Sequence, residues 1–198
     1  MNLPLVEEFH TIQGEGFHAG EAAWFIRLGG CDVGCSWCDS RFSWDPDMHP
    51  LVETGEIIEH AVYSGTKSVV VTGGEPLMWN LDFLCAGLKK RGISTFIETS
   101  GSYPLSGQWD WICLSPKRNV PPVGNICLIA DELKVIIEVR DDLEWAEKYR
   151  RLVGRRCMLY LQPEWSRFST IIPEIIAYVK GNPHWKISLQ IHKYMHIP

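Results

Sequence analysis

The sequence lacks an apolar run of membrane-spanning length, and its start, Met1-Asn-Leu-Pro-Leu, does not resemble a secretory signal. Cationic residues are in the minority, because 19 Lys and Arg stand against 24 Asp and Glu and give a net charge of -5. Broad nucleic-acid binding usually needs a basic excess, so we expect a small-molecule ligand, with no nucleic-acid or membrane partner. The seven cysteines are an odd number and cannot all pair as disulfides. We therefore expect a cytoplasmic protein with reduced thiols.

The length and composition fit one folding unit. A chain of 198 residues with 45% hydrophobic content is long enough to bury a substantial core. No segment has the composition of a linker, so we expect a single domain over residues 1–198.

Three of the cysteines lie in one short segment, Cys31-Asp-Val-Gly-Cys35-Ser-Trp-Cys38. Three thiolates can hold three corners of a [4Fe–4S] cluster and leave the fourth iron open to another ligand. An open position is typical of catalytic metal sites, whereas structural sites fill their coordination with protein ligands. The spacing therefore indicates a catalytic cluster.

The alternative is a zinc site completed by Asp39, by His18 or by a further cysteine. Zinc sites usually pair their cysteines in two separated knuckles, so a single loop favours the cluster. The remaining cysteines lie in apolar segments, and we expect them to be small core residues and not metal ligands. They are Cys85, Cys113, Cys127 and Cys157.

Hydrophobic periodicity predicts an α/β protein. Short apolar or alternating runs predict strands at 22–28, 67–72, 94–98, 111–115, 132–138, 157–162 and 187–191. Amphipathic segments predict helices at 54–63, 77–91, 141–153 and 170–180, with Gly65, Gly92, Gly154 and Gly181 as stop signals. Strands that alternate with helices predict a parallel sheet.

Most motifs with chemical potential directly follow a predicted strand. In α/β barrels the carboxyl ends of the strands carry the active site, so we expect these motifs to meet at one face. Segments 102–110 and 116–130 are rich in Pro, Gly and Ser and lack a helical period, so two crossover helices should be missing. The sequence therefore predicts a shortened, partly open barrel.

Several further motifs accompany the cysteines in a fixed order: Thr11-Ile-Gln-Gly-Glu-Gly16, Cys38-Asp-Ser40, Gly73-Gly-Glu-Pro76, Glu98-Thr-Ser-Gly101, Ser115-Pro-Lys117 and Gln190-Ile-His-Lys193. With them the chain resembles the 7-carboxy-7-deazaguanine synthase family of the radical S-adenosylmethionine (SAM) superfamily over nearly its whole length. The resemblance implies an abbreviated parallel (β/α) barrel of about six strands with a reduced number of outer helices. It also implies a homodimer that receives electrons from a donor such as flavodoxin.

The resemblance implies an activity as well. Members of this family convert 6-carboxy-5,6,7,8-tetrahydropterin to 7-carboxy-7-deazaguanine and ammonia, a step toward queuosine and related deazapurines. The cofactors implied are a [4Fe–4S] cluster on Cys31, Cys35 and Cys38, SAM, and Mg²⁺.

Residues for SAM carry over from the family motifs. They are Trp37, Cys38, Asp39, Gly74, Glu75, Ser115, Pro116, Lys117, Gln162, Pro163, Glu164 and Trp165. Gly74 and Glu75 would receive the amino group of SAM, although Gly-Gly-Glu-Pro could also be a plain turn before a helix. Lys117 could equally be a surface cation, and Pro116 could serve only to form a turn.

Substrate residues carry over in the same way, and they are Ile12, Gln13, Gly14, Arg27, Thr72, Glu98, His192 and Pro198. Arg27 alternates with apolar neighbours on its strand, so its guanidinium needs an anionic partner. That partner could be the substrate carboxylate or an internal acidic residue. His192, expected at a strand end, could be structural, and Pro198 could belong to a disordered tail.

Ser40 occupies the position at which related enzymes carry a Thr or Ser ligand of Mg²⁺. Mg²⁺ often takes only one or two protein oxygens and leaves the rest to water and substrate, so we expect a substrate-dependent site.

Two other functions share parts of this pattern. A small glycyl-radical activase would share the cysteines and Gly-Gly-Glu-Pro but would lack the segments around Gln13 and His192. A zinc interaction module would bind a single colourless ion and would not use SAM.

Overall fold

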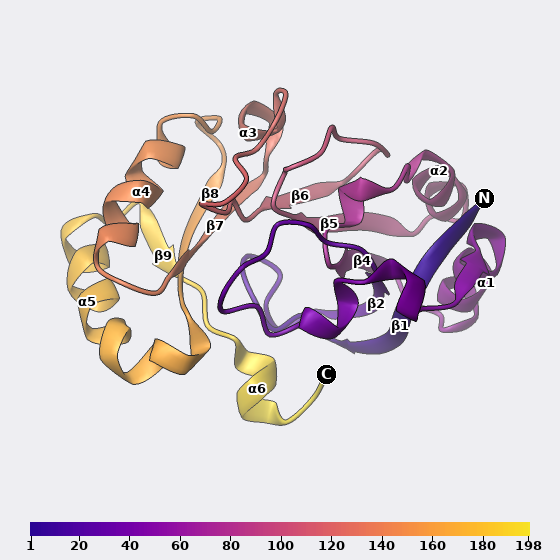
Figure 1. Cartoon of the computed structure of the whole chain (residues 1–198), viewed down its shortest axis with the longest axis horizontal. Coiled ribbons are helices and arrows are strands. Elements are labelled where there is room, and N and C mark those ends of the chain that lie inside the picture. Colours follow the sequence, from indigo (N-terminus) through magenta and orange to yellow (C-terminus); the bar gives the residue numbers. More distant parts are fainter.

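The structure, a computed structural model, describes residues 1–198. It contains a nine-stranded sheet in the order β3-β1-β2-β4-β5-β6-β7-β8-β9. The strands are β1 (Asn2–Ile12), β2 (Ala22–Leu28), β3 (Leu51–Glu53), β4 (Ser68–Gly73), β5 (Ser94–Thr99), β6 (Trp111–Leu114), β7 (Glu132–Ile137), β8 (Met158–Pro163) and β9 (Trp185–Ile187). β1 is antiparallel to β2 and β3, and every other neighbouring pair is parallel. The sheet curves without closing, so the predicted open α/β barrel is confirmed (Figure 1).

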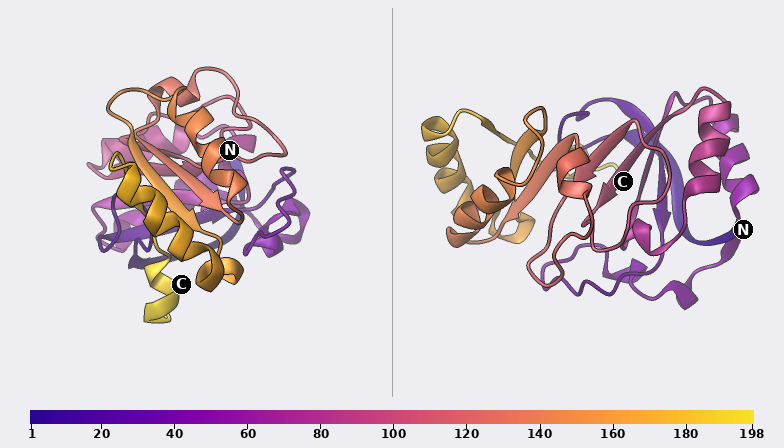
Figure 2. Two further views of the ribbon diagram at one scale, coloured as in Figure 1. Left: turned by 90° about the vertical axis from the view of Figure 1, so that its left-hand side faces the viewer. Right: turned by 90° about the horizontal axis from the view of Figure 1, so that it is seen from above.

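Helices cover the outer face of this sheet, except the short C-terminal helix, which lies on the concave side (Figure 1). The helices are α1 (Thr54–Tyr63), α2 (Asp82–Lys90), α3 (Ile126–Ile129), α4 (Asp141–Arg150), α5 (Phe168–Gly181) and α6 (Ile191–Met195). α1 and α2 pack against each other near one end of the sheet, and α4 and α5 cover β7, β8 and β9 at the other (Figures 1 and 2). None of the helices combines the length and the apolar character needed to cross a bilayer.

The hydrophobic core lies between the sheet and these helices, in two groups. The larger group holds fully buried residues such as Ile26, Val71 and Leu84, and the smaller one gathers around Leu161 and Ile175. Apolar side chains therefore point from the sheet toward the helices. The opposite, concave face of the sheet carries other residues.

The sheet has more strands than the seven expected from periodicity or the approximately six implied by the family resemblance. β1 escaped prediction because Glu7, Glu8 and His10 interrupt its apolar pattern, yet the strand pairs with β2 along most of its length. β3 and β9 have three residues each, too few for a periodic signal. Segment 102–110 contains no helix, as expected, and segment 116–130 contains only the four-residue α3.

Three of the expected helices have other bounds in the structure. The helix expected at 141–153 ends at Arg150. The helix expected at 77–91 is divided into a 3₁₀ turn at Pro76–Met78 and α2, which begins at Asp82. Asn80 explains the division, because its side-chain oxygen accepts the Asp82 backbone N–H at 3.0 Å and starts the helix again. The helix expected at 170–180 begins at Phe168 and includes Gly181, which was expected just beyond it.

The strand expected at 187–191 was also wrong. β9 ends at Ile187, and Ile191 is the first residue of α6, so His192 lies in a short helix and not at a strand end. The chain leaves the sheet because the Ile191 backbone N–H donates to the Gly14 carbonyl at 2.9 Å. This bond draws the C-terminal segment across to the segment between β1 and β2.

Candidate active site

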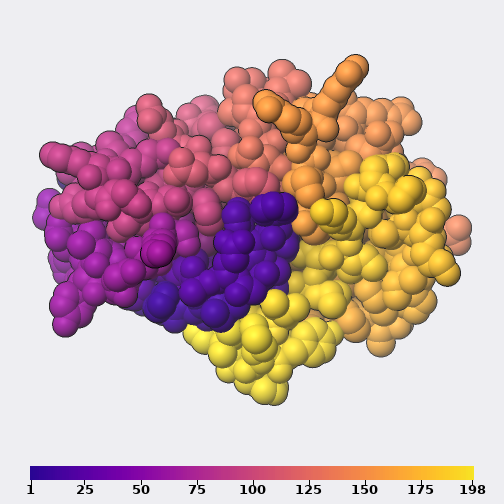
Figure 3. Space-filling view, turned by 180° about the vertical axis from the view of Figure 1, so that it is seen from behind, coloured from indigo at the N-terminus to yellow at the C-terminus, as the bar shows by residue number.

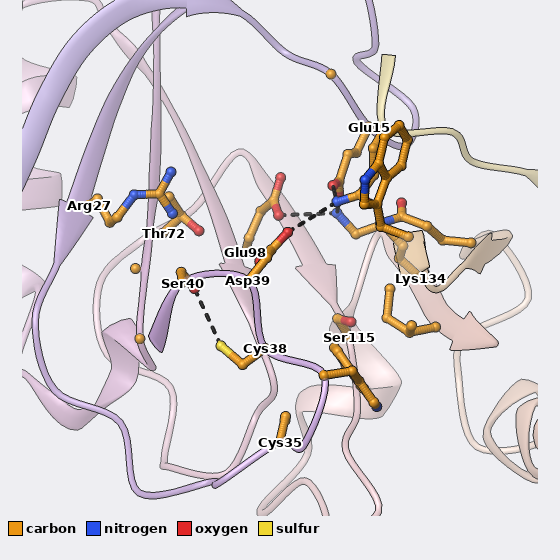
Figure 4. A pocket seen from close by; sticks show the side chains of 18 of the residues that line it. Glu15, Arg27, Cys35, Cys38, Asp39, Ser40, Thr72, Glu98, Ser115 and Lys134 are labelled. Atoms are coloured by element: carbon orange, nitrogen blue, oxygen red, sulfur yellow. Dashed lines mark hydrogen bonds and ion pairs between the residues drawn. The ribbon is translucent and has the colours of Figure 1, made fainter. Parts of the chain in front are cut away.

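A cavity of about 640 Å³ opens at the carboxyl ends of the parallel strands (Figure 4). Its volume lies in the ordinary range of ligand sites. The lining includes almost all residues predicted to bind the cluster, SAM, substrate or magnesium: Ile12, Gln13, Gly14, Arg27, Cys31, Cys35, Trp37, Cys38, Asp39, Ser40, Thr72, Gly74, Glu75, Glu98, Ser115, Lys117, Gln162, Pro163, Glu164, Trp165, His192 and Pro198. Pro116 is the exception, because it is buried beside Ser115 outside the lining.

Glycines at the end of β4 allow two segments to touch. Gly73 has φ of 139°, and a Cβ there would lie 2.1 Å from the Leu28 carbonyl oxygen. A Cβ on Gly74 would lie 2.3 Å from the Gly30 carbonyl oxygen. The Glu75 backbone N–H donates to that same Gly30 oxygen at 2.8 Å. Any side chain at these glycines would therefore push Gly-Gly-Glu-Pro away from the cysteine loop.

The Glu75 carboxylate is buried and fully engaged. It accepts the Thr99 hydroxyl at 2.5 Å, the Ser100 backbone N–H at 2.8 Å and the Leu77 backbone N–H at 3.0 Å. The bond from Leu77 caps the 3₁₀ turn at Pro76–Met78, so the turn considered from the sequence is present. The same bonds hold an acidic side chain in the lining of the cavity, where a cationic amine would be stabilised.

The cysteine loop is held from two sides. The Asn119 side-chain amide donates to the carbonyls of Val33 at 3.1 Å and Gly34 at 3.0 Å. The Tyr103 hydroxyl donates to the Asp32 carboxylate at 2.7 Å. These contacts fix the loop on the segments that follow β5 and β6, so the positions of its thiols depend on residues distant in sequence.

The three thiols fit a cluster with three cysteine ligands. Cys31, Cys35 and Cys38 are free and all line the cavity. No three His, Cys, Asp or Glu side chains converge on a single point, but a cluster binds each cysteine to a different iron and does not need such convergence. Of the fourth ligands considered for zinc, His18 lies beside another cavity and Asp39 forms an ion pair with a lysine.

Two local effects act on the thiols. Burial raises the pKa of Cys31 and also that of Cys35, although the nearby Lys117 charge opposes the second shift. The Trp44 indole N–H donates to the Cys38 sulfur at 3.3 Å. A bound metal would deprotonate these thiols outright, and a hydrogen bond to a ligand sulfur influences a cluster's reduction potential.

Three charged side chains, those of Glu15, Glu98 and Lys134, form the floor of the cavity. The Lys134 ammonium bonds to the Glu15 carboxylate at 2.5 Å and to Glu98 at 3.1 Å, and its side chain is only 4% exposed. The Gln13 amide donates to the other oxygen of Glu98 at 2.8 Å. Figure 4 shows Glu15, Glu98 and Lys134 gathered on the far side of the cavity from the cysteines.

The floor carries one net negative charge when its three ionisable groups are charged. Burial alone would raise the pKa of Glu15, but the Lys134 charge and hydrogen bonds from Lys134, Gln190 and Gln162 lower it to about 2. Burial alone would lower the pKa of Lys134, yet neighbouring acidic groups, Glu15 and Glu98 among them, raise it well above its ordinary value. Both shifts favour the charged pair.

Sequence reasoning missed Glu15 and Lys134. Glu15 stands inside the quoted Gln-Gly-Glu-Gly segment, and Lys134 interrupts the apolar run of β7, so a lysine in a buried strand was the available signal. Other lining residues without an earlier role include Phe9, Phe25, Phe42, Trp44, Thr99, Ser100, Ile136, Ser166, Gln190 and Lys193.

Arg27 forms an ion pair with an internal acidic residue, which was one of the two possibilities considered for it. Its Nε donates to the Glu7 carboxylate at 2.7 Å, and its guanidinium lies 5.9 Å from the centre of the Phe42 ring. It also lines the cavity, opposite Thr72 in the parallel pairing of β2 and β4. Glu7 is 42% exposed, so its ion pair is screened by solvent and can yield to a second anion.

Ser40 places a hydroxyl between the cysteine loop and Arg27 (Figure 4). The hydroxyl oxygen lies 3.6 Å from the Cys38 sulfur. One such oxygen is the kind of ligand that Mg²⁺ accepts, with water and substrate completing its shell.

The C-terminal segment closes one side of the cavity. Lys193 pairs with Asp39 at 2.9 Å, and the Thr11 hydroxyl donates to the Pro198 carbonyl at 3.3 Å. Burial lowers the pKa of His192, whose ring occupies the space of a Cβ on Gly14. Figure 3 shows the N-terminal and C-terminal segments side by side on the back of the molecule.

Known proteins share the motifs and the architecture described above. The Radical SAM superfamily model matches residues 25–114. The 7-carboxy-7-deazaguanine synthase of Flavobacterium psychrophilum is 52% identical, with 99% of this chain and 93% of that protein covered. The enzyme of the same name from Synechocystis is 47% identical, with 98% and 93% covered.

A solved structure agrees with these relatives. The crystal structure of QueE from Escherichia coli matches with a TM-score of 0.84 and 29% identity, over 96% of this chain and 94% of that one. The relatives and this chain thus match nearly end to end. The chain is an enzyme that belongs to the 7-carboxy-7-deazaguanine synthase family of the radical SAM superfamily.

Proposed function

We propose that the protein converts 6-carboxy-5,6,7,8-tetrahydropterin to 7-carboxy-7-deazaguanine and ammonia. Membership in the radical SAM superfamily implies a [4Fe–4S] cluster and SAM. When bound, these groups supply a one-electron cleavage of SAM that generates a hydrogen-abstracting radical. The protein's own residues bind and orient the reactants and exclude water.

The observation that carries this proposal is the division of one cavity into two chemically different ends. Three free cysteines line one end, and the floor of Glu15, Glu98 and Lys134 lies at the other. Cluster and SAM at the first end would face a substrate held at the second. A volume of about 640 Å³ accommodates a nucleoside-sized ligand and a bicyclic ring together.

The SAM-binding residues surround the cysteine end. We assign Cys31, Cys35 and Cys38 to the cluster, and the anchored carboxylate of Glu75 to the SAM amine. The other SAM contacts would come from Trp37, Asp39, Gly74, Ser115, Lys117, Gln162, Pro163, Glu164 and Trp165, all of which line the cavity. Pro116 would act only through the position of Ser115.

The substrate residues match the two polar ends of a carboxypterin. Glu98 and the Gln13 amide offer acceptors and donors to an aminopyrimidinone edge. Arg27 would exchange its exposed ion pair with Glu7 for the substrate carboxylate. Ile12, Gly14, Thr72, His192 and Pro198 line the space between and complete the proposed pocket.

The remaining parts of the proposal concern metal, partners and location. Mg²⁺ would bind Ser40 together with the substrate and stabilise its negative charge. The electron would come from a cytoplasmic donor such as flavodoxin, and the enzyme would act as a homodimer.

The test is an anaerobic incubation of the reduced, cluster-containing protein with the carboxytetrahydropterin, SAM and Mg²⁺, analysed by mass spectrometry. We expect a product with the mass of 7-carboxy-7-deazaguanine and one equivalent of ammonia. Omission of SAM should abolish both products, and omission of Mg²⁺ should slow them. SAM cleavage without pterin conversion would contradict the proposed substrate and favour another radical enzyme, such as a glycyl-radical activase.

A further inference from the structure

A second, much smaller cavity lies beneath the floor of the active site. Its volume is about 10 Å³, close to the space that one water molecule needs. Gln13, Glu15 and Glu98 line both this cavity and the large one, so a single layer of side chains separates the two cavities. His18 and Glu132 line only the small cavity.

These two residues carry buried polar atoms without a partner. They are the Nε2 atom of His18 and the Oε1 atom of Glu132. The Glu132 side chain is only 2% exposed, so solvent does not reach it. Buried polar atoms without a hydrogen bond are rare and costly, and two of them around one water-sized cavity indicate a bridging water.

His18 connects this cavity with the surface. Its Nδ1 atom lies 3.0 Å from the carboxylate of Glu21, a side chain that is 59% exposed. The ring stacks on Phe96 at 4.4 Å and meets the edge of Trp111, so its orientation is fixed. One ring nitrogen therefore faces an exposed carboxylate and the other faces the cavity, which is the arrangement of a proton shuttle.

Glu132 offers a proton-exchanging group on the same cavity. Its Oε2 atom accepts the Phe17 backbone N–H and the Trp111 indole N–H, both at 3.1 Å. Burial raises the pKa of Glu132, which favours its protonated form. The carboxyl group packs so closely on Gly16 that a Cβ there would lie 2.0 Å from Oε1.

We propose that the small cavity binds one water molecule, and that this water relays protons with His18 and Glu132 between solvent and Glu98 on the active-site floor. Glu98 is the floor carboxylate suited to this task, because Glu15, with its pKa lowered to about 2, is a weak base. The relay therefore runs from Glu21 through His18 to the water, which exchanges protons with Glu132 and with Glu98.

This relay rests on the proposed function, whose final chemistry requires proton transfer. Loss of ammonia breaks a C–N bond, and the electron pair of that bond leaves with the nitrogen. An N–H of the aminopyrimidinone edge gives its proton to Glu98, and the electrons of this N–H bond move through the conjugated ring and expel the amine. The relay carries the proton from Glu98 to solvent, and solvent supplies the proton that the leaving amine takes up. The neighbouring C–H bond then loses its proton to water and supplies the pair for the new C=C bond, while the ring system regains its N–H proton. No oxidant or reductant is consumed in the step.

The first test examines the water itself. A high-resolution crystal structure of the cluster-containing enzyme should show an ordered water within hydrogen-bond distance of both His18 Nε2 and Glu132 Oε1. A dry cavity, or direct contact between the two side chains, would overturn the proposal. This result does not depend on the identity of the substrate.

The second test separates proton transfer from the radical step. In the holoenzyme, His18→Gln should lower kcat for ammonia release by about 10-fold or more, with little change in KM. Transfer of deuterium from labelled substrate into the cofactor should keep its wild-type rate. Added imidazole should restore ammonia release, because it replaces the lost shuttle. Glu132→Gln, which keeps the shape of the side chain, should give a similar loss without imidazole rescue.

The control is His10→Gln, the same substitution at an exposed position on β1. Equal kcat for the His10 and His18 variants, no rescue by imidazole, or a parallel loss of deuterium transfer would each refute the relay. If the wild-type enzyme releases no ammonia from the pterin, the proposed function fails instead, and the crystallographic test of the water still stands.

Discussion

Replacing Lys134 with Met should destabilise the enzyme strongly, although Lys134 is not one of the expected cluster ligands. Lys134 is 4% exposed and bonds to both Glu15 and Glu98. Methionine has a similar length and apolar stem but no charge, so the substitution removes the ammonium while disturbing packing little. Two carboxylates would then remain in the floor without a cation.

The magnitude can be worked out from the charges. Removing one member of a buried ion pair costs about 3–5 kcal/mol, because the remaining charge stays desolvated. The pKa of Glu15, lowered from 4.5 to about 2, alone corresponds to about 3 kcal/mol of stabilisation at neutral pH. The Glu15 side chain is 14% exposed, so solvent screens little of this interaction. We therefore expect a loss of about 3–5 kcal/mol in the free energy of unfolding at pH 7.

The pH dependence of the free energy of unfolding should have the opposite sign in the Lys134→Met variant. In the wild type, folding lowers the pKa of Glu15. The charged Glu15 carboxylate therefore stabilises the folded state above pH 4.5, and this stabilisation is lost as the pH falls toward 2. Without Lys134, burial dominates and the pKa of Glu15 in the folded state rises above its unfolded value. The variant should then gain stability as the pH falls from 7 toward 4.5. Over the same range the stability of the wild type should stay constant or begin to fall.

Urea unfolding under anaerobic conditions, at equal iron content, measures this directly. Lys90→Met is the control, because Lys90 is exposed at the end of α2. We expect the control to stay within about 0.5 kcal/mol of the wild type. A Lys134→Met protein as stable as this control at pH 7, or one whose stability rises with pH between 4.5 and 7, would refute the electrostatic account of the floor.

Three further predictions concern the large cavity. Cys35→Ala should abolish SAM cleavage and lower the iron content, whereas Cys85→Ala should change neither, because Cys85 is buried in the core; an active, iron-containing Cys35 variant would disprove the ligand assignment. Arg27→Ala should lower kcat/KM for the pterin by a factor equivalent to about 2–3 kcal/mol. An unchanged kcat/KM would show that Arg27 serves only in its ion pair with Glu7. Trp44→Phe should shift the reduction potential of the cluster to a more negative value in an anaerobic redox titration, because it removes a hydrogen bond to a ligand sulfur; an unchanged or raised potential would contradict this role.

Much of the fold could be predicted because short-range sequence patterns determine the central strands. The strand expected at 22–28 and the helix expected at 54–63 match β2 and α1 residue for residue. β5 ends one residue later than expected, and β4 and β8 are each displaced by one residue toward the C-terminus. In each case the signal is a run of apolar or β-branched residues bounded by Gly or polar residues, which short-range physics suffices to explain.

The errors fall where distant segments decide the structure. α6 forms because Ile191 bonds to Gly14, a residue nearly the whole chain away, and no local pattern carries that information. β1 forms because β2 supplies a hydrogen-bonding partner for a sequence with several charged residues. The side chains predicted for the site did gather in one cavity, because motifs after parallel strands must meet at one edge. The contacts of Asn119 with the cysteine loop lie beyond this rule, since they depend on the path of an irregular segment.

β7 shows how one strand can serve both stability and chemistry. Its outward residues belong to the core beneath α4 and α5, and they are Leu133, Val135 and Ile137. Its inward residues form three successive levels of the concave face: Glu132 lines the small cavity, Lys134 lies in the floor, and Ile136 lines the large cavity. Because side chains alternate with a period of two, a shift of one residue in pairing with β8 would place the charges against the helices and the apolar side chains in the active site. The ion pairs of Lys134 therefore help to fix the register of the strand that carries them, which links the stability of the floor to the geometry of the site above it.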